Sequence, residues 1–217
     1  MGKDSFYAKY IKRKLDIICA LAAIVVFSWL YVILAILVYI NLGKPVLFKQ
    51  IRPGKDGKAF NLYKFRTMME SYNEDGTILP DEERLTTFGK ILRSTSLDEL
   101  PEAFNILRGD MSVVGPRPLL IQYLARYNDQ QSRRHDVRPG LSGYAQIHGR
   151  NSVSWEEKFD MDLWYIEHLS FWIDVKIVIQ SVFMVLKREG INSNTHATME
   201  EFMGTKKEQK TKNSSTR

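Results

Sequence analysis

Two adjacent carboxylates, Asp98 and Glu99, lie between Arg93 and Arg117 in a short stretch of the chain. Acids and arginines this close together, outside any amphipathic face, indicate a site for an anionic substrate. Prolines on both sides restrict the backbone of Arg117, and a positioned arginine can bind a phosphate through two hydrogen bonds. The alternative is a structural arginine paired with a surface acid. The two carboxylates are also candidate ligands for a metal ion.

The acid pair falls at what the sequence predicts to be a helix start. Ser96 to Glu99 matches the S-x-x-E capping box. With Ser96 as N-cap, Pro101 falls beyond the first turn; with Leu97 or Asp98 as N-cap, it lies in the first turn, where its missing N–H costs nothing. Either register places the carboxylates at a helix N-terminus, where the helix dipole lowers a carboxyl pKa. We therefore expect Asp98 to be ionised, as a nucleophile requires.

A small cationic pair, Lys64 and Arg66, ends the second strand of a predicted β-hairpin. Residues 46–48 are typical of a strand, the Pro-Gly and Asp-Gly pairs after them of a turn, and residues 59–63 of a second strand. The two cations are candidates for a phosphate contact, and the alternative is a solvated strand end.

Residues 138–151 form a loop rich in glycine, which we expect to recognise the base or the sugar of a substrate. Its candidate side chains are Gln146, Arg150 and Asn151. Residues 155–166 then return to helical spacing, and Asp162 falls on the same stripe as Trp155 and Phe159. An acid on an apolar face is either paired with a buried arginine or part of the site, and the spacing favours neither.

The elements that position these residues begin with a candidate membrane segment. Residues 17–40 carry no charged side chain. As a helix they would extend roughly 36 Å, enough to cross a bilayer core of about 30 Å. Basic residues flank the run on both sides, and the positive-inside rule places both flanks in the cytoplasm, which favours a re-entrant hairpin. The run has no Pro or Gly to break it, which favours a straight helix; we expect re-entry.

Asp16 would lie at the edge of this segment, where an unpaired charge is costly. Its expected ion-pair partner is Arg13, three residues earlier, with Lys12 as a second option. The sequence therefore predicts an ion pair between Arg13 and Asp16 at the membrane edge.

Residues 171–186 would form a helix of about 24 Å, which is short for a span. We expect this helix to lie in the membrane interface or beneath the domain, and its apolar face could equally serve a homodimer. The predicted organisation is a basic N-terminus and membrane helix (1–41), a catalytic domain (42–190) and a polar, disordered tail (191–217). The predicted fold is mainly α-helical with one small β-hairpin and interfacial amphipathic helices.

Composition narrows the class of partner. The net charge of +6 suggests an acidic partner, and anionic lipid or a phosphorylated small molecule fits. The chain has no zinc-finger spacing and no basic run interleaved with aromatics in its soluble part, so we expect no nucleic-acid partner. The single cysteine, Cys19, excludes a disulfide framework and fits a protein that faces the reducing cytoplasm.

Several long words of the sequence resemble, in the same order, those of the small monotopic phosphoglycosyl transferases. These bacterial sugar transferases start the synthesis of exopolysaccharide, capsule and glycoprotein glycans. The matching words are residues 12–16 (KRKLD), 63–68 (YKFRTM), 96–101 (SLDELP), 109–118 (GDMSVVGPRP), 138–143 (RPGLSG) and 149–151 (GRN), and Asp162 with Tyr165. The resemblance implies an enzyme of the bacterial inner membrane with its catalytic domain on the cytoplasmic face.

The resemblance also implies a reaction. A phosphosugar passes from a UDP-sugar to polyprenyl (undecaprenyl) phosphate, UMP is released, a covalent phosphosugar enzyme forms, and Mg²⁺ assists. Carried over, Asp98 is the nucleophile and Glu99 is its partner, as a metal ligand or a base. Arg93 and Arg117 would clamp the diphosphate, and Asp162 falls on a family word, which favours a place in the site.

One departure concerns the membrane segment, because the family commonly has Ser-Pro at its middle and this chain has Ser28-Trp29. Two other classes of function compete with the transferase. A non-catalytic, membrane-attached assembly factor of a glycan-export complex would need no magnesium. A membrane-bound nucleotidyl or phosphatidyl transferase would release pyrophosphate or CMP in place of UMP.

Overall fold

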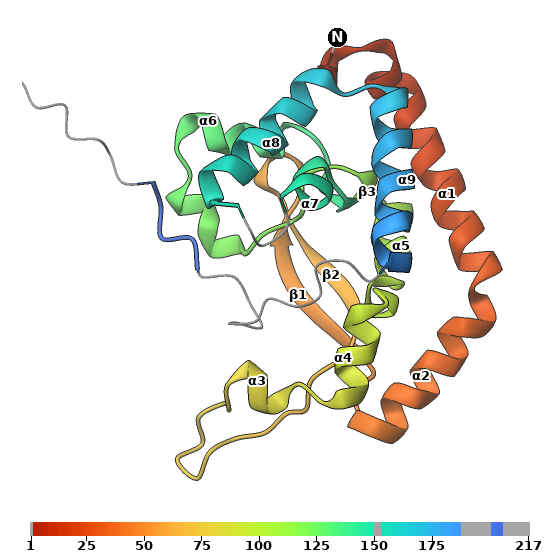
Figure 1. The fold of residues 1–217 in the computed structure, drawn as a ribbon, viewed down its shortest axis with the longest axis vertical. Helices are drawn as coiled ribbons and strands as arrows, with labels where there is room; N and C mark the ends of the chain where they lie inside the picture. Colours follow the sequence, from red (N-terminus) through yellow and green to blue (C-terminus); the bar gives the residue numbers. More distant parts are fainter. Residues whose placement is uncertain (1, 150–152, 188–200, 206–217) are drawn as a thin grey trace, which may run out of the picture.

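The computed structural model describes residues 2–149, 153–187 and 201–205. It is mostly helical with two small sheets (Figure 1), which confirms the predicted helical class with a hairpin. In chain order the helices are α1 (Lys12–Val26), α2 (Ser28–Leu42), α3 (Asp81–Arg84), α4 (Thr87–Ser94), α5 (Glu102–Arg108), α6 (Asp129–Ser132), α7 (Tyr144–His148), α8 (Trp155–His168) and α9 (Phe171–Lys187). The strands are β1 (Leu47–Pro53), β2 (Ala59–Phe65), β3 (Ser112–Val114) and β4 (Gly140–Ser142).

The predicted hairpin is confirmed as the antiparallel pair of β1 and β2, in which Leu47 faces Phe65 and Pro53 faces Ala59. A second sheet joins β3 and β4 in parallel. The sequence did not predict this sheet. The two backbones approach so closely there that a Cβ on Gly140 would lie 2.1 Å from the Gly115 nitrogen. Only glycine fits at that position.

α1 and α2 form one bent unit. Tyr7–Val26 and Ser28–Leu42 meet at 64°, and the break falls at Phe27, beside Ser28. Among the described residues no single helix is long and apolar enough to cross a membrane, whereas this bent pair passes that test as a unit. The chain therefore bends here without a proline.

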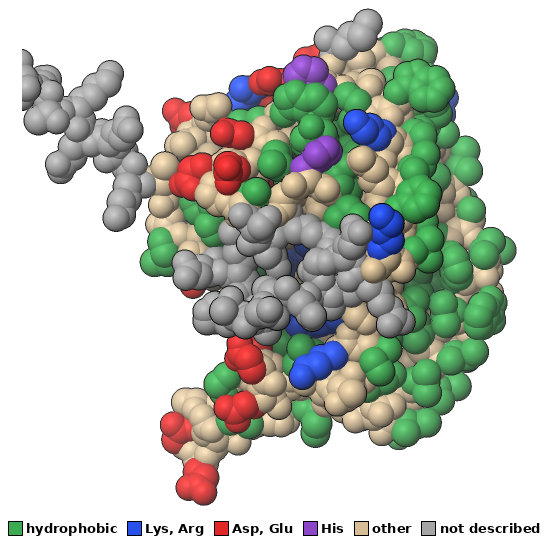
Figure 2. All heavy atoms as spheres, viewed as in Figure 1, with side chains coloured by type: hydrophobic (Ala, Val, Ile, Leu, Met, Phe, Trp, Pro, Cys, Tyr) green, Lys and Arg blue, Asp and Glu red, His purple; other side chains and the backbone are tan. Residues whose placement is uncertain are grey.

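Much of the outer surface of this bent unit is apolar. Val25 on α1 and Ile40 on α2 are each 70 % exposed, and Trp172 on α9 is 76 % exposed. In Figure 2 hydrophobic side chains gather along the edge of the molecule where α1 and α2 lie, and acidic side chains gather on the other side. Such a large exposed apolar surface marks an interaction face.

α9 packs on the domain through two polar residues, Asp174 and Ser181. The buried Asp174 accepts hydrogen bonds from Tyr7 and Tyr165, each at 2.7 Å, and pairs with Lys12 at 2.5 Å. Ser181, about two turns further along α9, bonds Ser142 of β4. The predicted packing of this helix against the domain is confirmed, and its interfacial location stays a prediction.

The predicted ion pair between Arg13 and Asp16 is wrong. Asp16 is buried and accepts hydrogen bonds from Ser112 Oγ (2.9 Å) and the Val113 nitrogen (3.0 Å). Arg13 donates to the carbonyl oxygens of Ile106 (2.6 Å) and Leu107 (2.9 Å). Both charges are satisfied by segments about 90 residues away, which an argument from helical spacing does not see.

Part of the expected disordered tail is folded onto the domain. Phe202 is only 2 % exposed and packs among the rings of Tyr123, Tyr127 and Phe159. Arg126 holds the same segment through Glu201 at 2.7 Å and the carbonyl oxygen of Phe202 at 2.5 Å. An aromatic side chain inside a polar tail was the signal for this contact.

Candidate active site

The acid pair lies in a tight turn before α5. Asp98 and Glu99 belong to the 3₁₀ turn Leu97–Glu99, and α5 begins after its N-cap, Pro101. Ser96 adopts a left-handed conformation (φ 54°) and its side chain makes no capping bond, so the predicted capping box does not form. Because proline lacks an N–H, it suits the start of α5 and ends the preceding turn.

Glu99 is held between two cations. Its Oε1 atom accepts from Lys64 Nζ at 2.6 Å and from Arg117 Nη2 at 2.7 Å. Lys64 also contacts Glu102 Oε1 at 3.2 Å. The structure thus brings together Lys64 from β2, Arg117 from the loop after β3, and the acid turn. The alternative of a structural arginine paired with a surface acid does not hold for Arg117, because its partner belongs to the acid pair.

The three carboxyls of this cluster have different proton affinities. Burial favours protonation of Glu99, but Arg117 and Lys64 outweigh it and lower the pKa of that carboxyl. Burial and the charge of Glu99 raise the pKa of Glu102 to about 7. A cluster with such divergent pKa values is typical of functional sites.

Asp98 is 7 % exposed and makes no hydrogen bond or ion pair with the described residues. Burial and then the charge of Glu99 raise its pKa to about 6, against the attraction of Lys64, Arg93 and Arg117. The expectation of a lowered pKa is therefore wrong, because desolvation outweighs the nearby positive charges. The carboxyl is still mostly ionised at neutral pH.

Two other predicted phosphate contacts have different outcomes. Arg93, at the end of α4, donates to Thr67 Oγ1 at 3.0 Å, and its charge acts on Asp98. Arg66 is buried and bonds the carbonyl oxygens of Leu42, Gly43 and Lys44. This guanidinium satisfies the C-terminal end of α2, where helix carbonyls lack partners. The prediction that Arg66 contacts a substrate phosphate is therefore wrong.

A cavity of about 900 Å³ opens beside the acid turn. Its polar lining includes Glu99, Arg117 and Gln146. Its apolar lining includes Ala23 of α1, Phe27 at the bend and Val182 of α9. Asp98 does not line this cavity, although Ser96 and Glu99 on either side of it do. The cavity can therefore take a ligand with one polar and one apolar part.

Asp162 is paired with a buried arginine, which confirms one of the two alternatives for an acid on an apolar face, and its place in the site stays a prediction. Its Oδ2 atom pairs with Arg134, with Nη2 at 2.7 Å and Nε at 3.1 Å, and both residues line the cavity. Arg134 also donates to the carbonyl oxygen of Arg117 at 2.9 Å. This pair therefore links α8 to the backbone of Arg117, whose side chain binds Glu99.

The recognition loop is only partly described. Gln146 on α7 lines the cavity and donates to the carbonyl oxygen of Leu141 at 3.2 Å. Its buried Oε1 atom has no hydrogen-bond partner in the described part of the chain. Arg150 and Asn151 lie outside the described residues.

Two residues of the site escaped the sequence reasoning. Glu102 was the third acid of the stretch and could have been found from its spacing after Asp98 and Glu99. Arg134 follows another arginine in a polar loop, which resembles an ordinary surface pattern. No local signal shows that it is buried against Asp162.

A metal ion at this site would need oxygen ligands from Asp98 and Glu99. Within the described residues, no group of three or more His, Cys, Asp and Glu side chains could hold one. Glu99 Oε2 and both oxygens of Asp98 accept no hydrogen bond from these residues. Mg²⁺ is commonly held by one or two carboxylates together with substrate phosphates. The adjacent acids fit that pattern.

Comparison with known proteins places this geometry in context. Residues 7–188 match the model of the family described as bacterial sugar transferase. The chain is 48 % identical over 194 residues to the uncharacterized sugar transferase EpsL of Bacillus subtilis, which covers 89 % of this chain and 96 % of that protein.

Two longer proteins with named activities are also similar. The chain is 34 % identical over 200 residues to undecaprenyl-phosphate galactose phosphotransferase of Salmonella typhimurium, which covers 84 % of this chain and 42 % of that protein. It is 40 % identical over 182 residues to a UDP-glucose:undecaprenyl-phosphate glucose-1-phosphate transferase of Klebsiella pneumoniae, which covers 79 % of this chain and 39 % of that protein. The chain spans less than half the length of these two relatives.

Proposed function

The chain belongs to the bacterial sugar transferase family, and we propose that it transfers a sugar phosphate from a UDP-sugar to undecaprenyl phosphate, with release of UMP. The named relatives support the reaction class. One structural observation carries the proposal most directly. Glu99, clamped by Lys64 and Arg117, lies on the wall of a cavity whose lining also includes apolar side chains of α1 and α9. A polar diphosphate sugar and a lipid phosphate can meet in such a cavity.

In the proposed first step, a carboxylate oxygen of Asp98 attacks the phosphorus that carries the sugar. The bond from that phosphorus to the oxygen of UMP breaks, UMP leaves with the electron pair, and an aspartyl phosphosugar forms. In the second step, an oxygen of the lipid phosphate attacks the same phosphorus and releases the Asp98 carboxylate. Because Asp98 does not line the cavity, its side chain must rotate toward it for the attack.

The cations of the site would offset the negative charge that makes this attack difficult. Arg117 and Lys64 can each move from Glu99 toward a phosphate oxygen, and Arg93 adds a third positive charge near Asp98. Asp98 and Glu99 would hold Mg²⁺ together with the substrate phosphates. When bound, the ion would neutralise charge on the phosphate oxygens.

The direct test is incubation of the purified protein with a panel of UDP-sugars, undecaprenyl phosphate and Mg²⁺, scored by UMP release. We expect one or a few sugars to support release that depends on the lipid phosphate. Release of CMP from a CDP-linked donor, or no release with any UDP-sugar, would contradict the proposal. Omission of Mg²⁺ tests the cofactor separately, and unchanged turnover in a chelator would remove it.

We further propose that the bent pair of α1 and α2 is a re-entrant membrane hairpin and that the catalytic cavity faces the cytoplasm of a bacterial cell. The 64° bend and the exposed apolar surface support this. The same surface could pair with a second copy, so a homodimer stays a prediction.

The test of re-entry is impermeant labelling of Lys14→Cys, which lies before Asp16 and is exposed, in a Cys19→Ser background. Lys58→Cys on the hairpin turn is the matched control for the catalytic domain. We expect both sites to react only from the cytoplasmic side. Periplasmic labelling of Lys14→Cys alone would show that the segment spans the membrane.

A further inference from the structure

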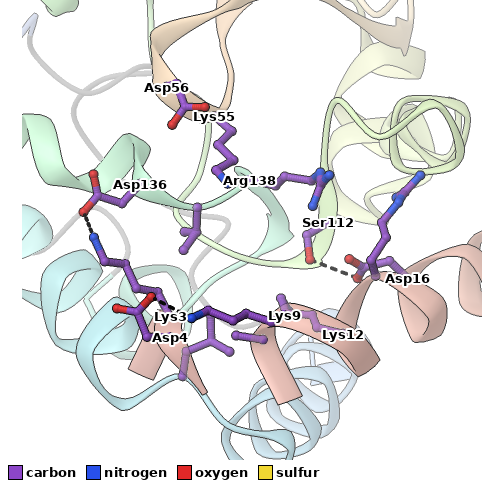
Figure 3. Close-up of a pocket in the computed structure, with 14 residues that line it drawn as sticks. Lys3, Asp4, Lys9, Lys12, Asp16, Lys55, Asp56, Ser112, Asp136 and Arg138 are labelled. Carbon is purple, nitrogen blue, oxygen red and sulfur yellow. Dashed lines mark hydrogen bonds and ion pairs between the residues drawn. The ribbon is translucent and has the colours of Figure 1, made fainter. Parts of the chain in front are cut away.

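Figure 3 shows a second cavity, of about 500 Å³. Arg13 and Arg138 in its lining bond the backbone at the C-terminal end of α5, the end opposite the acid turn. Its walls come from the N-terminal segment, the first turns of α1, the tip of the hairpin and residues 136–138. It shares no lining residue with the larger cavity. The transferase reaction proposed above leaves this cavity without a role.

Most charges around this second cavity are already paired. Lys3 pairs with Asp136 at 2.5 Å, as Figure 3 shows, and Lys9 lies 3.4 Å from Asp4. Lys12 is paired with Asp174. Asp16 accepts two hydrogen bonds from the β3 strand, both at Oδ1, and forms no ion pair within the described residues. The paired groups therefore need no ligand.

Three cations of the lining remain without an ion-pair partner among the described residues: Arg13, Lys55 and Arg138. Asp56, an exposed acid at the rim, is likewise without one. Among the described residues of the lining, the unpaired cations therefore outnumber the unpaired acids. In Figure 3 the side chains of Lys55 and Arg138 extend from different segments into this space.

The two arginines are fixed by the backbone at the end of α5. Arg13 donates to the carbonyl oxygens of Ile106 and Leu107, and Arg138 Nε donates to that of Gly109 at 2.8 Å. Capping of a helix C-terminus explains these three bonds. It does not employ the two Nη groups of Arg138, which donate to no acceptor in the described part of the chain.

The arginines also repel each other. After burial, the positive charge of Arg138 is the second cause that lowers the pKa of Arg13, against the weaker attraction of Asp16 and Asp110. An anion between like charges removes such repulsion, and planar guanidinium groups favour the paired oxygens of a phosphate. A mobile lysine such as Lys55 adds a point charge.

We propose that Arg13, Lys55 and Arg138 form a second phosphate-binding site that takes a phosphate ester. The ester belongs either to a lipid headgroup or to a soluble molecule. The lipid source is consistent with Phe6 and Tyr10, which are exposed on the neighbouring N-terminal segment and could enter a bilayer interface.

The test titrates the full-length protein in detergent with inorganic phosphate and with dihexanoyl phosphatidylglycerol below its critical micelle concentration, by calorimetry. Lys55→Gln is the main variant, because Lys55 is exposed and should not affect folding. Lys58→Gln is the matched control, since it has the same charge on the same turn and does not line the cavity. Arg138→Gln is the second variant, with a melting curve to verify its fold.

We expect Lys55→Gln and Arg138→Gln each to weaken binding by about tenfold, as loss of a charge-assisted bond predicts. Lys58→Gln should bind like the wild type. Binding of the lipid probe alone would assign the site to a headgroup, and binding of inorganic phosphate as well would assign it to phosphate esters in general. Failure of both probes to bind, or equal loss in Lys55→Gln and Lys58→Gln, would overturn the proposal.

Discussion

Two ionic groups line the same cavity and differ in how their charges are matched. Arg134 and Asp162 are both nearly fully buried and form one pair, in which Arg134 also donates to Tyr127 and lies over the ring of Phe159. The Glu99 cluster instead has three carboxyls, Asp98, Glu99 and Glu102, and within the described residues two cations, Lys64 and Arg117, form ion pairs with them. Only one oxygen of Glu99 accepts hydrogen bonds from these residues. Both groups contain buried charged side chains, so burial alone does not distinguish a reactive group from a structural one. The paired group is built for stability, and the unbalanced one can bind a phosphate and exchange protons.

The largest expected effect tests the unbalanced cluster. Asp98→Asn should lower UMP release by at least about a thousandfold, because it removes the proposed nucleophile. It should leave stability unchanged or raise it slightly, since a buried carboxylate with a raised pKa disappears. Turnover and a melting curve measure the two effects. Asp160→Asn, an exposed acid on α8, is the matched control, and substantial turnover by Asp98→Asn would remove its assigned role.

The paired group should respond in the opposite way. Asp162→Asn leaves the buried Arg134 without its counter-ion, which typically costs about 3–5 kcal/mol. Urea unfolding measures this loss. A double variant, Arg134→Met with Asp162→Leu, should recover most of the stability because no charge is left unpaired. If Asp162→Asn is as stable as the wild type, the view of this pair as a structural unit is wrong.

Acid should lower the stability of the folded protein through His135, the neighbour of Arg134 in sequence. Burial and then the charge of Arg134 lower the pKa of His135 from 6.5 to about 4. Between these values the unfolded chain binds the proton more readily, so stability falls as pH falls from about 6.5 to about 4, by up to about 3 kcal/mol. The pH dependence of urea unfolding should be flatter in His135→Gln. An equal slope in both proteins would contradict the assignment to this residue.

The smallest effect concerns the tail segment that packs behind the pair. Phe202 stacks on Tyr127 at 5.8 Å between ring centroids, and Tyr127 bonds Arg134. Phe202→Ala should release residues 201–205 and raise amide exchange there by about tenfold or more, while global stability changes little. Met203→Ala is the control, because that neighbour is exposed. Unchanged exchange in Phe202→Ala would show that the ring does not hold the segment.

Local patterns predicted the elements whose partners are near in sequence. The hairpin follows from its strand-like residues and its turn residues. The bend at Phe27 was expected from charge on both flanks, although no residue in the segment marks it. The β3–β4 pair was missed because parallel strands need a long connection and leave no short-range signal.

The site was predicted in part for the same reason. The structure brings the predicted acids and cations together, because each charge is compensated by a neighbour of opposite sign. They are Asp98, Glu99, Arg93, Arg117 and Lys64. Arg66 and Arg13 were misassigned because each bonds backbone carbonyls rather than an ion. The sequence shows that a residue is a cation, but only the fold decides which acceptor it bonds.

The sequence by itself determined which residues are candidates for chemistry: two adjacent acids before Pro101, flanking arginines, and an apolar N-terminal run. These are properties of residue type and short spacing. Only the tertiary structure decided that Asp98 is desolvated, that Glu99 takes both cations, and that Arg134 closes on Asp162. Burial and long-range pairing set the pKa values of the acid pair, and both depend on segments that meet only when the chain folds.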